Sequence, residues 1–222
     1  MGKNRAAKQK LDQIYDRMFE HFGNRGWWPG DSNLEICVGA ILTQSVSWKN
    51  VAKAIGNLRK AGLLELDKLY QADLEDIENC IIPTLYYRQK AKKLKAFVNH
   101  VTEENAENLT AFLGKNLPEL REELLSLYGI GPETADSIIL YAAEKPVFVV
   151  DAYTRRIFSR LGLFNDDITY EEMQNYFMQH LPPDVQFYNE YHALIVGTGN
   201  RFCNNKKPKC AECPLSGLCS QE

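Results

Sequence analysis

The chain has 222 residues, 45% hydrophobic and 25% charged, which is enough apolar sequence for a core in one domain or in two small lobes. No uncharged apolar run reaches the roughly 18 residues of a membrane span, so we expect no transmembrane helix. The basic start MGKNRAAKQK is not followed by the apolar segment of a secretory signal, so we expect an intracellular protein.

Apolar residues recur at helical spacing along almost the whole chain. Together with glycine stops and capping residues, they predict helices over 8–23, 33–44, 48–62, 66–71, 72–80, 88–101, 118–127, 132–144, 151–162, 170–180 and 187–198. Asp31 or Ser32 is expected to cap the second of these helices, and Asp151 the one that begins there. The only β-like run, KPVFVVD, is short, so we predict an all-α fold.

Charge is segregated along the chain although the formal net charge is only −3. Taken as a sum, this charge argues against a nucleic-acid partner. Acidic residues collect at 64–79, 102–108 and 165–172, and basic residues at 87–95, 154–160 and 200–209. The pattern is compatible with one basic face and acidic sides, although each run taken alone is more typical of a solvated helix surface.

Four of the six cysteines lie close together near the C-terminus, as Cys203-x6-Cys210-x2-Cys213-x5-Cys219. In an intracellular chain this density indicates metal binding rather than disulfides. A zinc site usually has two paired knuckles, whereas an iron–sulfur cluster tolerates irregular spacing, so the pattern favours a cluster and leaves zinc open. Lys206 and Lys207, between the first two cysteines, are positioned to present charge to phosphates.

The segment LLSLYGIGPETADSIIL, 124–140, reads as a helix, a tight Gly-Ile-Gly turn and a second helix. Both glycines are expected to allow positive φ. The free amides at the start of the second helix suit a phosphate, although an ordinary turn between helices explains the pattern equally well. Asp151 is an N-cap candidate whose carboxylate, held ionised by backbone donors, could also stabilise a developing cation or orient a water.

The order LYGIGPETAD, VVDAYTRR and the cysteine pattern resembles the endonuclease III branch of the helix-hairpin-helix DNA glycosylases over about 31–219. The resemblance implies a barrel lobe of six helices (31–140, with the hairpin at about 118–144) and a second lobe from 1–30 and 141–222. It implies a [4Fe–4S] cluster on Cys203, Cys210, Cys213 and Cys219, and Asp151 as the essential aspartate. It also implies a monomer that binds double-stranded DNA containing a damaged base between the lobes, in the cytoplasm at the nucleoid.

The resemblance assigns further DNA contacts, because the family flips the damaged base out of the duplex. Gln44 matches the glutamine that is inserted into the duplex, and Leu85 or Tyr86 the intercalating wedge, with packing as the alternative for Tyr86. The hairpin residues expected to contact DNA are Gly129, Ile130, Gly131 and Thr134.

Glu133 occupies the position where bifunctional family members carry a lysine nucleophile. A carboxylate cannot form the Schiff base that leads to strand cleavage. We therefore predict a monofunctional glycosylase, in which Asp151 stabilises the cationic sugar, water completes the hydrolysis, and an abasic site remains.

The aromatic residues Trp27, Trp28 and Trp48, together with Pro29 and Glu133, resemble the base pocket of the 3-methyladenine DNA glycosylase III type. A methylated purine is positively charged, so stacking on indole rings gains a cation–π contribution. Packing between the N-terminal segment and the barrel is the alternative for the tryptophans. Gly39 stands where the adenine-mismatch branch needs a glutamate, which disfavours that activity.

Alkylated purine is thus the leading substrate. A glycosylase for mismatched or oxidised pyrimidines and a non-catalytic DNA-damage sensor are the alternatives. The sensor is weakened by the presence of Asp151, which binding alone does not require.

Overall fold

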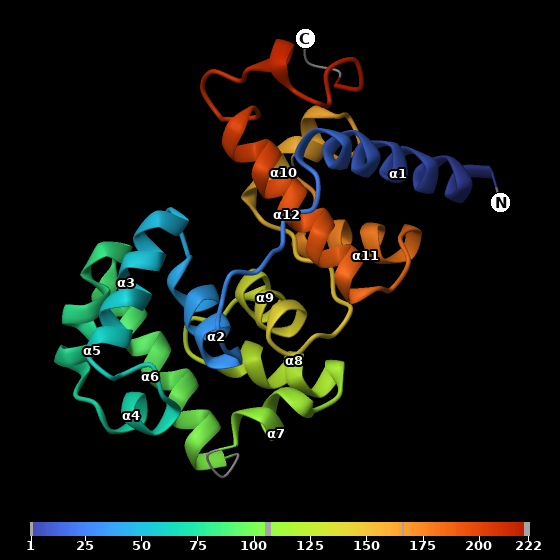
Figure 1. The fold of residues 1–222 in the computed structure, drawn as a ribbon. Coiled ribbons are helices and arrows are strands. Elements are labelled where there is room, and N and C mark those ends of the chain that lie inside the picture. Colours follow the sequence, from blue (N-terminus) through green and yellow to red (C-terminus); the bar gives the residue numbers. More distant parts are fainter. Residues whose placement is uncertain (1, 105–107, 166, 220–222) are drawn as a thin grey trace. The chain divides into compact units, whose positions relative to one another are not determined.

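The computed structural model describes residues 2–104, 108–165 and 167–219, and in these ranges the chain is helical without a β-strand (Figure 1). The helices are α1 (Gly2–Phe22), α2 (Asn33–Leu42), α3 (Trp48–Lys60), α4 (Leu66–Gln71), α5 (Leu74–Ile81), α6 (Tyr87–Glu104), α7 (Leu109–Gly114), α8 (Leu117–Ser126), α9 (Pro132–Tyr141), α10 (Ala152–Arg160), α11 (Tyr170–His180) and α12 (Val185–Arg201), with short 3-10 helices η1 (Ile82–Thr84) and η2 (Cys210–Glu212). The expected all-α fold is confirmed. None of the described helices is long and apolar enough to cross a membrane.

The helix assignment differs from the sequence prediction at its start, where α1 begins at Gly2 rather than at residue 8, and at one additional helix. The short helix α7 was not predicted, because it offers too few residues for a periodic pattern. The run 145–151 is extended but pairs with no other segment, so its apolar side chains pack into a core without forming a sheet.

The chain divides into two compact units. The central unit comprises residues 29–145, and the terminal unit comprises residues 1–28 together with 146–222. The sequence analysis placed the corresponding boundaries at 30/31 and 140/141.

The central unit is built around α2, which packs against α3, α6 and α9. Residues 37–42 of α2 are all buried, and a helix that is apolar on every side is stable only inside a core. Of the two predicted caps, Ser32 is the one observed: its hydroxyl accepts a hydrogen bond from the Glu35 N–H at 3.2 Å.

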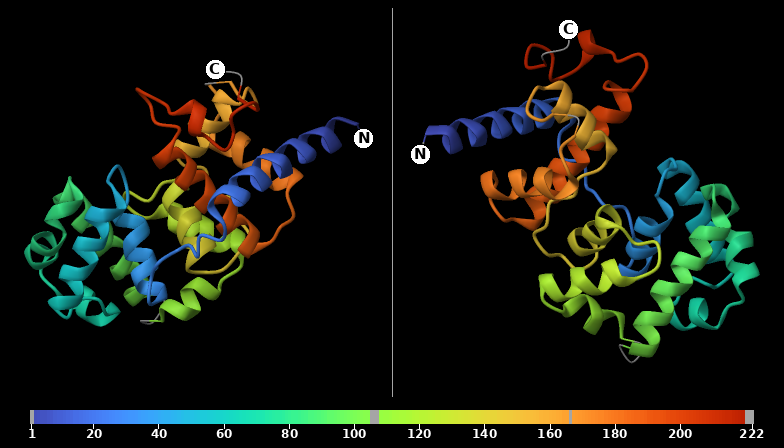
Figure 2. Two further views of the ribbon diagram at one scale, coloured as in Figure 1. Left: turned by 45° about the horizontal axis from the view of Figure 1, so that its top comes forward. Right: turned by 180° about the vertical axis from the view of Figure 1, so that it is seen from behind.

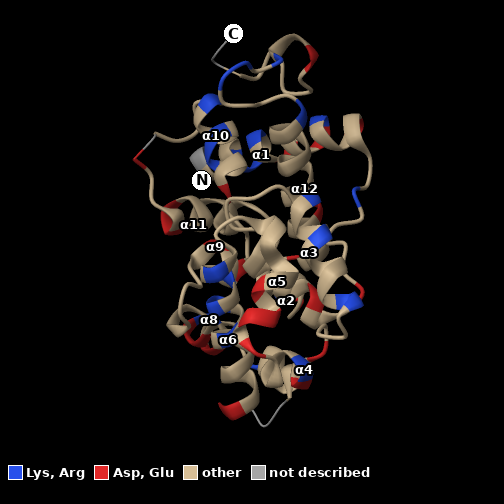
Figure 3. Ribbon diagram, turned by 90° about the vertical axis from the view of Figure 1, so that its left-hand side faces the viewer, with Lys and Arg blue, Asp and Glu red and all other residues tan. Residues whose placement is uncertain are grey.

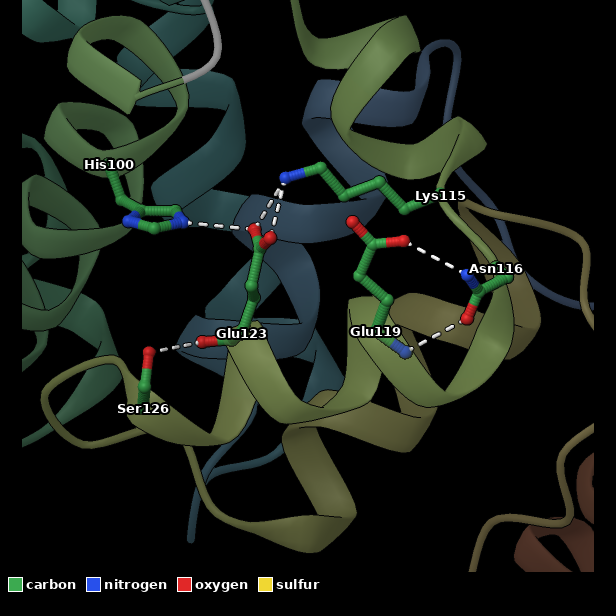
Figure 4. Close-up of polar contacts among 6 residues, drawn as sticks. All are labelled: His100, Lys115, Asn116, Glu119, Glu123 and Ser126. Atoms are coloured by element: carbon green, nitrogen blue, oxygen red, sulfur yellow. Dashed lines mark hydrogen bonds and ion pairs between the residues drawn. The ribbon is translucent and has the colours of Figure 1, made fainter.

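Helix α8 is held at its start and along its length by polar contacts (Figure 4). The Asn116 side chain caps it by accepting a hydrogen bond from the Glu119 N–H at 3.1 Å. Lys115 Nζ lies 2.6 and 2.8 Å from the two carboxylate oxygens of Glu123, and His100 Nε2 on α6 lies 3.2 Å from one of them. Burial raises the pKa of Glu123, but Lys115 and His100 outweigh this and lower it.

A buried ion pair joins α8 to α9. The Arg121 guanidinium donates two hydrogen bonds to Asp136, 2.8 Å from Nε to Oδ1 and 3.2 Å from Nη2 to Oδ2. The Asp136 side chain is fully buried, which removes its carboxylate from water. The two hydrogen bonds from Arg121 offset this desolvation cost. This pair fixes the helix-turn-helix segment as a unit.

The terminal unit brings both ends of the chain together. Helix α12 packs against α1 and α10, as the blue and red ribbons of Figures 1 and 2 show. Its core is aromatic: Phe148 stacks on Phe177 with ring centroids 4.1 Å apart, and Tyr191 is fully buried beside them. A Cβ atom at Gly199 would lie 2.3 Å from the Tyr153 ring, so only glycine permits α10 to approach α12 this closely.

Candidate active site and DNA-contacting elements

Asp151 is the N-cap of α10, as its sequence context predicts. Its Oδ1 accepts hydrogen bonds from the backbone N–H of Thr154 at 2.7 Å and from the Thr154 hydroxyl at 2.8 Å. The Asp151 side chain retains 12% exposure, so its second oxygen is not sealed inside the protein. The cap therefore fixes one carboxylate oxygen and leaves the other for a different partner.

That second oxygen faces His192, a residue of α12 that the sequence analysis did not single out. His192 Nε2 lies 3.6 Å from Asp151 Oδ2, and the His192 side chain is 6% exposed. Burial raises the pKa of Asp151, but His192 and Thr154 outweigh it and hold the pKa below its ordinary value. The carboxylate is consequently ionised at neutral pH, as the stabilisation of a cation requires.

The turn between α8 and α9 uses its two glycines differently. Gly129 has φ of +75° and is packed against the stem of Lys93, where a Cβ atom would lie 2.4 Å from Lys93 Cε. Gly131 has φ of −99°, so the prediction of positive φ is wrong there: Gly131 serves as the N-cap of α9 in extended backbone. Nothing lies within 4 Å of a Cβ placed on Gly131, so an anion can approach the first-turn amides.

The start of α9 also completes a polar network around Gln44. Gln44 Nε2 donates to the carbonyl of Gly129 at 3.2 Å and to the hydroxyl of Thr134 at 2.9 Å. Lys93 Nζ on α6 donates to Gln44 Oε1 at 2.5 Å. The sequence analysis assigned Gln44, Gly129 and Thr134 to DNA contacts. In the structure Gln44 is hydrogen-bonded to both of the others, and Lys93 is a further hydrogen-bond partner of Gln44. Ile130, between the two glycines, is buried at 4% exposure and packs inward.

Large side chains are exposed in two segments that precede residues of this network in the sequence, one before Lys93 and one before Gly129. Leu85 is 56% exposed and Tyr86 is 75% exposed, directly after η1. Both residues have positive φ, 53° and 46°, a conformation that residues other than glycine rarely adopt. Tyr128, just before the hairpin glycine, is 57% exposed, and its hydroxyl donates to Gln89 at 3.0 Å. Exposed aromatic side chains of this kind can stack on nucleobases.

The tryptophans are distributed over both units. Trp27 and Trp28 lie in the terminal unit with their rings in an edge-to-face pair, centroids 5.4 Å apart. Trp48 lies in the central unit as the first residue of α3, and Pro29 is exposed at the start of that unit. All three tryptophans are partly exposed rather than core residues. Glu133 lies in the first turn of α9.

The four C-terminal cysteines surround one cavity of about 110 Å³. Burial raises the pKa of the Cys213 thiol, and the charges of Cys203, Cys210 and Cys219 raise it further, so these three cysteines lie near Cys213. Among the described residues, no three His, Cys, Asp or Glu side chains converge on a single metal position. One zinc ion would need such convergence, whereas in a cluster each thiolate binds its own iron around a larger inorganic core. The spaced thiols around a cavity therefore fit an iron–sulfur cluster.

Arginines of α10 hold the loop that carries these cysteines. Arg156 Nε donates to the Cys203 carbonyl at 2.7 Å, and Arg160 Nη1 lies 3.2 Å from Cys203 Sγ and 3.0 Å from the Asn204 carbonyl. In Figure 3 the blue segments of α10 and of the C-terminal loop mark this basic region. Lys206 and Lys207 on the loop are exposed and remain accessible to a phosphate backbone.

Comparison with known proteins gives consistent results. A family model described as HhH-GPD superfamily base excision DNA repair protein matches residues 38–183, and one for the iron–sulfur binding domain of endonuclease III matches residues 206–219. A protein of Methanocaldococcus jannaschii, provisionally named a DNA repair glycosylase, is 45% identical over 213 residues, which cover 95% of this chain and 96% of that protein.

Two solved structures extend the comparison. The 3-methyladenine DNA glycosylase of H. pylori, bound to 1,N6-ethenoadenine, has a TM-score of 0.75 and 26% identity, covering 88% of this chain and 97% of that one. A DNA complex of endonuclease III has the same fold, with a TM-score of 0.81, 23% identity and coverage of 96% and 95%. The chain therefore belongs to the HhH-GPD superfamily of base excision repair DNA glycosylases, which act on the N-glycosyl bonds of DNA, and it carries a [4Fe–4S] cluster of the endonuclease III type.

Proposed function

We propose that this protein is a monofunctional glycosylase that hydrolyses the N-glycosidic bond of an alkylated purine in double-stranded DNA and leaves an abasic site. The observation that carries the monofunctional assignment is Glu133, in the first turn of α9. A carboxylate there cannot attack the sugar to give the Schiff base that precedes strand cleavage.

Asp151 supplies the catalytic charge. As the bond to the base weakens, positive charge develops on the sugar, and an ionised carboxylate beside it lowers the energy of that state. The hydrogen bonds from Thr154 and the neighbouring His192 keep Asp151 ionised and fixed in orientation. Water then adds to the sugar, its proton is lost to solvent, and the departing purine keeps the electron pair of the broken bond.

An alkylated purine suits both the catalytic group and the aromatic residues. N3- or N7-methylation makes the base cationic, so it leaves without strong acid catalysis and stacks favourably on indole rings. We assign recognition of the base to Trp27, Trp28, Pro29, Trp48 and Glu133. The similarity to the 3-methyladenine glycosylase of H. pylori supports the choice.

We assign duplex binding to the hairpin residues Gly129, Ile130, Gly131 and Thr134 together with Lys206 and Lys207. Ile130 serves as the buried anchor of the turn. Amides of the α9 first turn receive a phosphate, and the two lysines add charge. Gln44 and the exposed pair Leu85 and Tyr86 fill the space vacated by the flipped base. The four cysteines would hold the cluster, and with every iron bound to a cysteine it would offer no open position to a substrate.

Two assays test the proposal. Chromatography of bases released from dimethyl-sulfate-treated DNA should detect 3-methyladenine or 7-methylguanine, and heat-labile abasic sites should accumulate without strand breaks. Borohydride added during the reaction should trap no protein–DNA adduct. A trapped adduct would refute the monofunctional assignment, whereas release of mismatched or oxidised pyrimidines alone would replace the substrate class.

A further inference from the structure

Two loops of the central unit share one buried anchor. Lys90, on α6, is only 3% exposed, and its Nζ donates to the carbonyl of Leu42 at 2.9 Å and to the carbonyl of Thr84 at 2.5 Å. Leu42 is the last residue of α2 and Thr84 the last residue of η1. The ammonium group therefore joins the ends of two helices that are far apart in sequence.

The chemistry of this contact is specific for a lysine. Carbonyl groups at a helix C-terminus lack intrahelical donors and carry partial negative charge, which an ammonium group neutralises. Burial, with a contribution from Lys93, lowers the pKa of Lys90 to about 8, so burying this charge is costly. The two carbonyl acceptors offset that cost, and an apolar side chain would leave both carbonyls buried without these donors.

Each anchored carbonyl directly precedes a loop of unusual backbone. Ser45, in the loop after α2, has φ of 56°, and Leu85 and Tyr86, after η1, have φ of 53° and 46°. Such values are strained in residues other than glycine and persist where the surroundings enforce them. Gln44 lies in the first loop, and the exposed Leu85 and Tyr86 form the second.

We propose that Lys90 is a positioning residue that locks these two loops together, so that Gln44 and the Leu85–Tyr86 pair enter the duplex as one rigid element. The inference deepens the proposed function and rests on its assignment of both loops to the duplex. Lys90 itself is buried and touches no DNA. Its removal impairs the distortion of DNA and leaves the encounter with the duplex intact.

Lys95 provides a matched control on the same helix. Its Nζ donates to the carbonyls of Tyr70 at 2.6 Å, Ala72 at 3.2 Å and Leu69 at 3.3 Å, and so closes the end of α4. It has the same side chain and the same kind of acceptors, but the segment it anchors carries none of the residues assigned to DNA.

The experiment compares the iron–sulfur-loaded wild type, Lys90→Met and Lys95→Met on a duplex with 2-aminopurine opposite a tetrahydrofuran abasic analogue. The wild type should increase 2-aminopurine fluorescence on binding, because insertion of the loops unstacks the reporter. Lys90→Met should reduce that increase at least fivefold at saturating protein, while its Kd for undamaged duplex changes less than threefold. Lys95→Met should keep the full increase.

A fluorescence increase in Lys90→Met equal to that of the wild type would overturn the inference. An equal reduction in Lys90→Met and Lys95→Met would also overturn it, because it would reflect a general loosening of the central unit. If circular dichroism shows that Lys90→Met does not fold, Lys90→Gln replaces it, since the amide keeps donors but reaches only one carbonyl. A wild type that binds without any fluorescence increase would overturn the loop assignment and the role of Lys90. Base release by that wild type would leave the glycosylase assignment standing.

Discussion

Replacing Asp151 by asparagine separates its charge from its role in the fold. The asparagine side chain can still accept the 2.7 and 2.8 Å hydrogen bonds from Thr154, and asparagine caps helices as well as aspartate does. The free energy of unfolding should therefore fall by less than about 1 kcal/mol. The electrostatic loss is larger, since a unit charge about 4 Å from a cation contributes about 4 kcal/mol at an effective dielectric constant of about 20. That energy corresponds to about a thousandfold in rate.

Single-turnover base release from alkylated duplex, with enzyme in excess, measures this loss without interference from product release. Thermal unfolding and duplex binding of the Asp151→Asn protein provide the controls, and Asp151→Ala, which also loses the cap, should be less stable by about 1 kcal/mol more. Asp151→Asn releasing base within tenfold of the wild-type rate would refute the electrostatic role. The wild-type rate should also stay level on the acid side until the pH approaches the lowered pKa of Asp151, below its ordinary value of 3.8.

Three further predictions concern the fold and the pocket. Arg121→Met removes the guanidinium paired with the fully buried Asp136 and should lower the free energy of unfolding in urea by about 3 kcal/mol, with Arg121→Lys intermediate. Glu123→Gln should lower the free energy of unfolding by about 1 kcal/mol at pH 7. Because folding lowers the pKa of Glu123, the difference in free energy of unfolding between wild type and variant should shrink as the pH falls through that pKa. A difference that stays constant with pH would contradict the charge interaction of Glu123 with Lys115 and His100. Trp27→Ala should reduce base release at least tenfold while duplex affinity and unfolding temperature change little; equal loss of all three would make the tryptophan a packing residue.

Local features of the sequence were sufficient for most of the helices, for the Asp151 cap and for the conformation of Gly129. Asp151 was recognisable as an N-cap because the interaction involves residues three apart, and the φ of Gly129 follows from a short turn. The prediction for Gly131 was wrong because one positive φ already reverses the chain, leaving the second glycine in extended backbone.

Contacts between distant residues were not recognisable. His192 lies on a helix that begins more than thirty residues after Asp151. Lys93 reaches Gln44 across 49 positions and Lys90 reaches Leu42 across 48. In the sequence these lysines belong to an ordinary charged run, and only the packing of α6 against α2 distinguishes them from surface residues.

The terminal unit combines residues 1–28 with residues 146–222, and this affects the order in which the two units can fold during synthesis. Tyr191 donates to the carbonyl of Leu11 across 180 positions, and Arg17 donates to that of Ser216 across 199. On the ribosome, all of residues 29–145 emerge before these partners of α1 are synthesised, so the central unit has time to fold first. Helix α1 cannot dock until Tyr191 and Ser216 have been synthesised, and closing so long a loop is slow. Completion of the cysteine loop and docking of α1 thus come after the central unit, so that the cluster can be inserted into a chain whose central unit is already folded.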